Sequence, residues 1–296
     1  LIPDLVEECG KKGTRWMAIP SGGFNELSDE GRKLADLLLE KARTYGIRFV
    51  GPNGLTVANT ANGLCLPFIP SFPPPKGGFS LISQSGGVGI MLWNFMTDEN
   101  IGMAKFASIG NKLNLDEVDF LEYFGRDPET KIIGMYLESI PRGKELIAAA
   151  EKIDKPIIIL KSNTTMAGRR AAMSHTAALS NDDEIIDVAF KRAGIIRISH
   201  FNDFISVAKA FDLPPMRGNR LMMMSPAGGI TVMMADLCEK IGFRFADPGR
   251  EFYEGLKGFS NAGVINFSNP LDMGDIYDPN LYAKIFYEVM HNDHID

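Results

Sequence analysis

The chain alternates between two patterns of apolar residues. Short, nearly continuous apolar runs, such as 132–138 and 156–161, predict strands that are buried on both faces of a sheet. Other segments, such as 28–45, carry an apolar residue every three or four positions and predict amphipathic helices. Strands that alternate with helices along a chain favour an α/β fold built on parallel sheets.

These patterns give an expected order of elements. Helices are expected at residues 1–11, 28–45, 87 onward, 116–126, 142–152, 182–193, 203–211, 230–240 and 282–290. Strands are expected at residues 16–20, 47–50, 79–83, 105–108, 132–138, 156–161, 195–198 and 221–224.

Two proline-rich breaks divide this order into three domains. Residues 69–78 hold four prolines and two glycines, a composition that continues neither a helix nor a central strand. A second break follows at 213–215. We therefore expect domains at 1–70, 71–215 and 216–296. Residue 1 already belongs to a helical pattern and no strand follows the last helix, so we interpret the chain as an internal part of a longer polypeptide.

One short pattern, Ser-x-x-Gly-Gly, occurs twice, at 83–87 and at 225–229. Each copy follows an expected strand and begins an expected helix. Backbone N–H groups at the start of a helix have no partner within it and lie at the positive end of the helix dipole, so such a turn binds phosphate well. The alternative is two similar domains with similar turns and no shared ligand.

A histidine lies between the two copies. His175 belongs to a run of small and turn-forming residues after a buried strand, and sites in open α/β sheets lie at the carboxyl ends of strands. It could therefore carry a phosphoryl group held between the two helices. Glu138, at the end of another buried strand, could accept the ring N–H and leave the other nitrogen free to attack phosphorus. The alternatives are a structural histidine and a solvent-facing glutamate.

The composition excludes several classes of function. The 31 basic and 37 acidic residues give a net charge of −6, which argues against nonspecific nucleic-acid binding. No apolar run approaches the roughly 20 residues of a membrane span. Cys9, Cys65 and Cys238 are far apart, so we expect no disulfide framework, no zinc or other metal site, and a cytoplasmic location. The sequence contains no Walker-type loop, and Ser83 stands where a hydrolase nucleophile elbow needs glycine.

Taken together, the motifs resemble those of the NDP-forming acyl-CoA synthetase superfamily, which includes succinyl-CoA synthetase and ADP-forming acetyl-CoA synthetase. The resemblance spans nearly the whole chain. It rests on the segments Ile19-Pro20-Ser21-Gly22-Gly23-Phe24, Gly51-Pro52-Asn53-Gly54, 83–87, Ser108-Ile109-Gly110-Asn111-Lys112, Tyr136-Leu137-Glu138, Ser174-His175-Thr176, 225–229 and Asn269-Pro270-Leu271-Asp272. Ala177 departs from the family pattern, because it stands where the family has a more flexible glycine.

The resemblance implies a fold and a set of site residues. The fold would be the C-terminal half of a Rossmann-like CoA-binding domain, followed by two flavodoxin-like (succinyl-CoA synthetase-like) parallel α/β domains, the last one truncated. His175 would be the catalytic phosphoryl carrier, supported by Glu138. The residues implied for CoA are Ile19, Pro20, Ser21, Gly51, Pro52 and Asn53, those for phosphate are Ser83, Ser85, Gly86, Gly87, Ser225, Ala227, Gly228 and Gly229, and those for the acid substrate are Gly110 and Asn111, with Lys112 beside them.

The implied reaction interconverts an acid, CoA and ATP with acyl-CoA, ADP and phosphate, through an acyl phosphate and phosphorylated His175. It requires CoA, and ATP or ADP with Mg, bound mainly by an ATP-grasp domain or β subunit that lies outside this chain. We expect a dimer or hetero-oligomer, and no full reaction from this chain alone. The alternative is a noncatalytic module that senses CoA or acyl-CoA, in a protein lysine acetyltransferase or an accessory protein.

Overall fold

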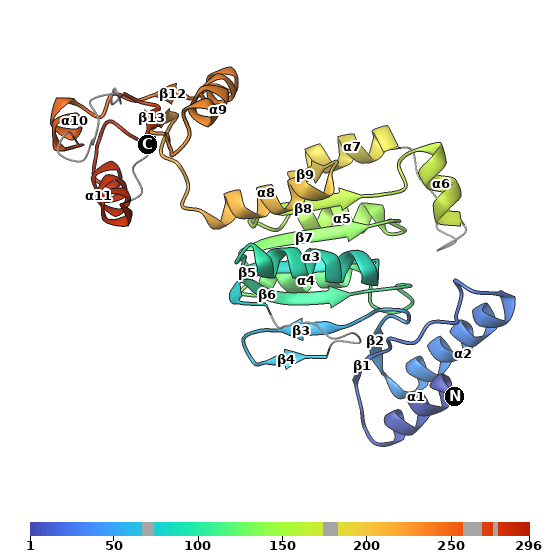
Figure 1. Ribbon diagram of the computed structural model, residues 1–296. Coiled ribbons are helices and arrows are strands. Elements are labelled where there is room, and N and C mark those ends of the chain that lie inside the picture. The colour runs from blue at the N-terminus through green and yellow to red at the C-terminus, as the bar shows by residue number, and fades with distance from the viewer. Residues whose placement is uncertain (67–73, 174–182, 257–267, 275–277) are drawn as a thin grey trace. The chain divides into compact units, whose positions relative to one another are not determined.

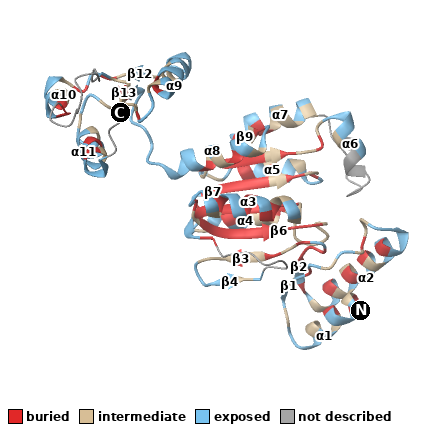
Figure 2. Ribbon diagram, viewed as in Figure 1, coloured by how far each residue is buried: buried red, intermediate tan, exposed pale blue. Residues whose placement is uncertain are grey.

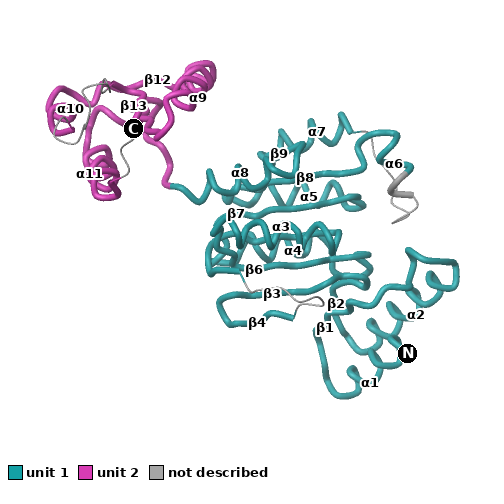
Figure 3. Tube along the Cα trace, viewed as in Figure 1, with its two compact units in different colours: residues 1–213 teal, residues 214–296 magenta. Residues whose placement is uncertain are grey.

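The computed structural model describes residues 1–66, 74–173, 183–256, 268–274 and 278–296, and the side chains of residues 169 and 171–173 lie outside the description. The chain divides into two compact units, Leu1–Leu213 and Pro214–Asp296, which Figure 3 shows in different colours. Among these residues, no helix combines the length and the apolar character that a membrane crossing requires.

The first unit is built on a seven-stranded sheet. Its strands are β3 (Val57–Asn59), β4 (Leu64–Cys65), β5 (Lys76–Ser83), β6 (Met103–Ser108), β7 (Ile132–Leu137), β8 (Ile157–Lys161) and β9 (Ile195–Ile198). They lie in the order β4-β3-β6-β5-β7-β8-β9. The five strands from β6 to β9 are parallel, and β3 and β4 add an antiparallel edge. The parallel part has the flavodoxin-like strand order 2-1-3-4-5, so the connections change direction between β5 and β7, where such sheets bind ligands.

Helices cover both faces of this sheet (Figure 1). One core packs α4 (Glu117–Arg126), α5 (Gly143–Ala150) and α7 (Asp183–Arg192) against the strands. A second core packs α3 (Gly86–Asp98) and α8 (Phe201–Asp212) against the opposite face. The central strands are therefore buried on both sides, as Figure 2 shows. This arrangement explains why β7 and β8 read as continuous apolar runs.

The beginning of the first unit forms a smaller α/β layer. It contains α1 (Ile2–Lys11), β1 (Trp16–Ala18), α2 (Asp29–Tyr45) and β2 (Arg48–Val50), with β1 and β2 parallel and both helices packed in one core. The Ser28 side chain caps α2 at its start, and Gly46, with φ +64°, ends it. This layer contacts the connection between β6 and α4, because the N–H of Phe49 donates to the Asn114 side chain at 2.9 Å.

The second unit has its own, smaller core. Its strands form two parallel pairs, β10 (Arg220–Leu221) with β12 (Arg244–Phe245), and β11 (Met224–Ser225) with β13 (Leu271–Asp272). Its helices are α9 (Gly228–Lys240), α10 (Arg250–Leu256) and α11 (Pro279–Met290). The core gathers apolar side chains of α10, α11 and the β11–β13 pair.

The expected elements are present, with three differences. Residues 76–78, expected in a linker, form the start of β5, because a Cβ on Gly77 would lie 2.3 Å from the Cα of Gly102 and only glycines allow the two backbones to approach so closely. The strand expected at 221–224 is divided between β10 and β11, which pair with different strands. The short strands β3, β4, β12 and β13 and the helices α6 (Met166–Met173) and α10 were not predicted.

Candidate functional site

The first Ser-x-x-Gly-Gly turn lies at the change of direction in the large sheet. It joins β5 to α3, and the hydroxyl of Ser83 donates to the backbone oxygen of Ser85 at 2.6 Å. The Ser85 hydroxyl in turn accepts from the N–H of Val88 at 3.4 Å and caps the helix. Ser83 therefore shapes the turn from within the core, while the backbone of the turn forms the start of α3.

Glu138 lies beside this turn. It follows β7, the neighbour of β5, two residues after Tyr136, which is paired with Ser83. The Tyr136 hydroxyl donates its one proton to the Glu138 carboxylate at 3.4 Å, and its oxygen lies within hydrogen-bond distance of Ser162 Oγ at 3.2 Å. Burial, with the Glu138 carboxylate as a further cause, raises the pKa of Tyr136, so this hydroxyl remains a donor at neutral pH. Two of the predicted site elements therefore meet.

His175 lies outside the described residues, as do its neighbours in 174–182. The described chain leads up to this segment through α6, which follows β8, and leaves it through α7. Because β8 is the neighbour of β7, the chain that leads to this segment leaves the sheet from the strand next to the one that ends at Glu138. The role of His175 stays a prediction.

The residues predicted for CoA form one connected set of turns. The N–H of Ile19 donates to the oxygen of Val50 at 3.0 Å, and the N–H of Asn53 donates to the oxygen of Ser21 at 2.9 Å. Gly51 has φ +96°, and a Cβ there would lie 2.4 Å from the backbone oxygen of Ile19. Glycine is therefore required where the loop after β1 meets the turn after β2.

The residues predicted for the acid substrate contact this set. The N–H of Asn111 donates to the oxygen of Pro52 at 2.9 Å, and the Asn53 side chain donates to Asn111 Oδ1 at 3.3 Å. Gly110 has φ +54°, and a Cβ there would lie 2.2 Å from the same Pro52 oxygen. The turn after β6 and the two turns of the small layer therefore form a single cluster.

Glu26 holds this cluster together. Its carboxylate accepts from the N–H of Gly23 at 2.6 Å, from the N–H of Phe24 at 3.1 Å, and from the Asn111 side chain. Burial opposes the charged form of this carboxylate, but the hydrogen bonds outweigh burial and lower the pKa of Glu26. The sequence pattern around Glu26 predicts no role for it, because its partner Asn111 is 85 residues away.

The second Ser-x-x-Gly-Gly turn has the same internal hydrogen bond. The Ser225 hydroxyl donates to the oxygen of Ala227 at 3.3 Å and accepts from its N–H at 3.1 Å. Ala227 begins α9 and offers no side-chain cap. A Cβ on Gly228 would lie 2.3 Å from Oδ2 of Asp272, which shows that this carboxylate lies at the start of α9. A Cβ on Gly229 would meet no atom within 4 Å in the described part of the chain.

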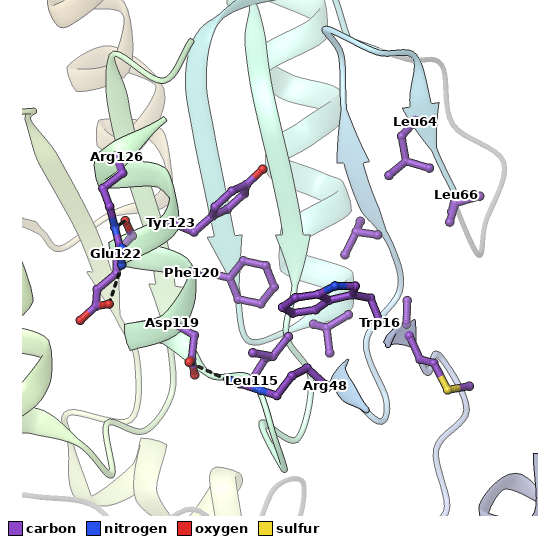
Figure 4. A pocket seen from close by; sticks show the side chains of 14 residues that line it. Trp16, Arg48, Leu64, Leu66, Leu115, Asp119, Phe120, Glu122, Tyr123 and Arg126 are labelled. Atoms are coloured by element: carbon purple, nitrogen blue, oxygen red, sulfur yellow. Dashed lines mark hydrogen bonds and ion pairs between the residues drawn. The ribbon is translucent and has the colours of Figure 1, made fainter. Parts of the chain in front are cut away.

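An apolar groove of about 680 Å³ lies elsewhere on the first unit. Figure 4 shows it, with Trp16 from the start of β1 facing Phe120 and Tyr123 from α4, and the ion pair of Arg48 and Asp119 beside them. None of the predicted site residues that the structure describes lines this groove. In the described ranges, no group of three or more histidine, cysteine or acidic side chains could hold a metal ion.

The fold and the turn at its change of direction define a flavodoxin-like α/β domain, and comparisons with known proteins give its family. Residues 76–211 match the family described as a succinyl-CoA ligase like flavodoxin domain. This match, together with relatives named as ADP-forming acetate–CoA ligases, confirms the resemblance to the NDP-forming acyl-CoA synthetase superfamily that the motifs carry.

Its relatives are similar over nearly all of this chain. It is 39% identical over 276 residues to an ADP-forming acetate–CoA ligase of Methanocaldococcus jannaschii, which covers 92% of this chain and 38% of that protein. It is 36% identical over 286 residues to the α subunit of ADP-forming acetate–CoA ligase I of Pyrococcus furiosus, covering 95% of this chain and 61% of that subunit. These names give no support to the sensing module considered as an alternative.

A solved structure is similar in fold as well. It is dinucleotide forming acetyl-coenzyme A synthetase 1 of Ca. Korarchaeum cryptofilum in complex with phosphate and ADP, with a TM-score of 0.83 and 32% identity. The similarity covers 99% of this chain and 63% of that chain. This chain therefore spans less than two thirds of the relatives that it matches.

Proposed function

We propose that this chain is the CoA-binding and phosphoryl-carrying part of an NDP-forming acyl-CoA synthetase. One observation carries the proposal: the Ser-x-x-Gly-Gly turn after β5 and Glu138 after β7 meet at the change of direction of a flavodoxin-like sheet. The segment with His175 leaves the same sheet after β8. The names of the relatives support this activity.

The three domains expected from the sequence would each contribute a part of this function. Residues 1–70 would be the C-terminal part of a Rossmann-like CoA-binding domain, which the parallel β1–β2 pair and its helices support. Residues 71–215 would be a flavodoxin-like ligase domain with the phosphohistidine. Residues 216–296 would belong to a second flavodoxin-like ligase domain. The parallel pairing of β11 with β13, and the helix α9 that follows β11, support this.

The cluster of turns suits CoA, which presents alternating methylene and amide groups along its pantetheine arm. The exposed Pro20 offers an apolar ring, Ser21 a hydroxyl, and the exposed Asn53 an amide. Ile19, Gly51 and Pro52 would set the shape of the loops rather than supply side-chain contacts, because all three are buried. Gly110 and Asn111, in contact with this set, would place the acyl group beside the CoA sulfur.

The phosphoryl group would pass through His175. Phosphate attacks the thioester carbonyl, forms a C–O bond and releases the CoA thiolate, giving an acyl phosphate. A ring nitrogen of His175 then attacks phosphorus, the P–O bond breaks, and the carboxylate leaves. Glu138 would accept the N–H of the other ring nitrogen and stabilise the imidazolium.

N–H groups of both turns would face the phosphoryl oxygens, since fixed donors need little reorganisation during transfer. Their residues would be Ser83, Ser85, Gly86 and Gly87 in the first turn and Ser225, Ala227, Gly228 and Gly229 in the second.

ADP would receive the phosphoryl group from His175 on an ATP-grasp domain or β subunit, which would also hold the Mg ion. One relative is named as an α subunit, which supports a separate or linked partner of this kind. Relatives named for acetate support a monocarboxylic acid as the substrate.

The nucleotide product tests this proposal. The complete protein, with its ATP-binding part, is incubated with acetate, CoA and Mg-ATP, and the products are separated by chromatography. We expect ADP, phosphate and acetyl-CoA in equal amounts, and none of them with His175→Asn. Formation of AMP and pyrophosphate, or acetyl transfer to protein lysines without a nucleotide product, would overturn the proposal.

A further inference from the structure

The two-residue turn after β7, Glu138–Ser139, is held by side chains at every backbone polar group. The N–H groups of both residues donate to Oε1 of Gln84, at 2.8 and 3.0 Å. The Glu138 oxygen accepts from Nζ of Lys161 at 2.9 Å, and the Ser139 oxygen accepts from Nζ of Lys112 at 2.8 Å. In addition, Nε2 of Gln84 donates to Ser139 Oγ at 3.2 Å. Turns at the ends of strands normally leave such groups to water.

The three side chains come from three other turns at the same edge of the sheet. Gln84 follows β5 and Lys161 ends β8, and these two strands flank β7 on its two sides. Lys112 lies in the turn after β6. The contacts join residues that are 23 to 55 positions apart in the sequence. They therefore fix the turn relative to the Ser-x-x-Gly-Gly backbone and to the chain that leads to His175.

These side chains are withdrawn from water. Gln84 is 9% exposed, Lys161 is 8% exposed, and the side chain of Lys112 is 5% exposed. Burying an ammonium group costs free energy unless it is paired or hydrogen-bonded. Lys112 has the buried Glu117 carboxylate at 3.0 Å, whereas the acceptors described for Lys161 are the backbone oxygens of Glu138 and Ser162. The stability of the strand end alone does not explain why a glutamine and two lysines are buried around this turn.

We propose that Gln84, Lys112 and Lys161 are positioning residues that clamp the Glu138–Ser139 turn, so that the Glu138 carboxylate is held ready for the histidine that carries the phosphoryl group. The proposal rests on the proposed function. Tyr136, whose hydroxyl contacts the same carboxylate, completes the support from the side-chain end. Misplacing a reacting group by about 1 Å costs about 100-fold in rate, so a clamp of this kind controls phosphoryl transfer without touching phosphate.

The environment of Lys161 agrees with this role. Its burial lowers its pKa to about 8, although the carboxylates of Asp183 and Glu138 act in the opposite direction. The charged form of Lys161 is therefore unfavourable at this buried position. From the same position its ammonium group donates to the backbone oxygen of Glu138.

The test removes the contacts of one side chain at a time. Gln84→Met and Lys161→Met keep the approximate length of each side chain and remove its hydrogen bonds. Gln84→Glu retains an acceptor oxygen for the two N–H groups. Lys105→Met is the matched control, because Lys105 is equally buried, at 4% exposed, but pairs with Asp127 and Glu129 instead.

Phosphorylation of the complete protein by Mg-ATP is followed by rapid quench at several ATP concentrations. We expect the rate constant to fall about 10- to 100-fold in Gln84→Met and Lys161→Met, with the KM for ATP changed less than threefold. Gln84→Glu is expected to recover most of the rate, and Lys105→Met to remain within twofold of the wild type. Rates within twofold of the wild type in both Met variants would overturn the proposal.

Amide hydrogen exchange separates this proposal from the proposed function. The N–H groups of Glu138 and Ser139 are expected to lose at least tenfold in protection in Gln84→Met, while those of residues 134–136 in β7 do not change. Unchanged protection at Glu138 and Ser139 would overturn the clamp whatever the activity. If Gln84→Met loses this protection but the wild type takes up no phosphate, the clamp has a structural role only, and the proposed function is contradicted.

Discussion

The two Ser-x-x-Gly-Gly turns share an internal hydrogen bond and differ in nearly everything around it. In both, the first serine donates to the backbone oxygen two residues later. The helix after the first turn, α3, buries Trp93 and four other residues, whereas α9 after the second buries Thr231 alone among its residues. Val232 and Met233 of α9 are 66% and 71% exposed.

The position after the first serine separates the turns further. Gln84 connects the first turn to Glu138, while Pro226 occupies the equivalent place in the second and has neither an amide side chain nor a backbone N–H. Each turn nevertheless has a carboxylate from the neighbouring strand beside it, Glu138 after β7 and Asp272 at the end of β13. The motif sets the geometry of the turn, and distant residues decide how firmly it is held.

The largest expected difference concerns the two helices. Trp93→Ala removes a fully buried ring that packs edge-on against Phe106 at 5.2 Å, and we expect a loss of about 3–5 kcal/mol in the free energy of unfolding. Met233→Ala, on the exposed α9, is expected to change it by less than about 0.5 kcal/mol. Urea unfolding followed by circular dichroism measures both. Equal losses would show that α9 is packed in the whole protein and would remove the contrast.

A pH effect is expected from Lys161, which lies beside the first turn only. Its pKa of about 8 in the folded protein is below the ordinary value of 10.5. Below pH 8 the lysine is charged in both states, and between about pH 8 and 10.5 only the unfolded chain retains the proton. The stability of the wild type should therefore rise with pH across this window, by about 3 kcal/mol relative to Lys161→Met.

Measuring the free energy of unfolding of both proteins at pH 7 and pH 10 tests this. The charged groups that act on Lys161 are Asp183, Arg197, Lys112 and Glu138, and all of them remain in the variant. Lys33→Met, which changes an exposed lysine of α2 and keeps Lys161, serves as control and should show the same rise with pH as the wild type. A difference between wild type and Lys161→Met that does not depend on pH would contradict the burial of this charge.

A smaller effect distinguishes the first glycines of the two turns. A Cβ on Gly86 would lie 2.3 Å from Cγ of Leu55, whereas a Cβ on Gly228 would meet the tip of the Asp272 side chain, which can rotate away. We expect Gly86→Ala to cost about 1–3 kcal/mol and Gly228→Ala less than about 1 kcal/mol. Tryptophan fluorescence during urea unfolding reports on the first unit, and hydrogen exchange of α9 reports on the second. The reverse order would show that the second turn is the more tightly packed.

The smallest expected effect is the same in both turns. Among the residues that the structure describes, no atom beyond the immediate chain lies within 4 Å of a Cβ on Gly87 or on Gly229. Alanine at either position should stabilise its helix by about 0.5–1 kcal/mol, because glycine loses more backbone freedom on folding. The same two measurements apply. Destabilisation at one position alone would reveal a neighbour that only one of the turns has.

The parallel sheet could be predicted because its strands are local patterns. The apolar runs of β7 and β8 and the capped helix α2 follow from neighbouring residues alone. The strands β3 and β4 could not be predicted in this way, because each has only two or three residues and pairs at the edge of the sheet. Their stability depends on the partner strand rather than on their own pattern.

The site residues also differ in whether the local sequence predicts them. Glu138 and the first turn could be found from their places at strand ends, and the structure brings them together. Gln84 had no recognisable signal, and Lys161 had a weak one, since the contacts of both depend on the order of strands in the sheet. A lysine that ends the apolar run of β8 was the one available indication.

Phosphorylation of His175 is the most direct test of the account. The complete protein is incubated with Mg-ATP, and its intact mass is measured after acid and after alkali treatment. His200→Asn, the same substitution at the exposed start of α8, is the matched control for His175→Asn. The account predicts one acid-labile, alkali-stable phosphate in the wild type and in His200→Asn, lost on adding acetate and CoA, and none in His175→Asn. A wild type without phosphate, or a His175→Asn variant that retains it, would contradict the account.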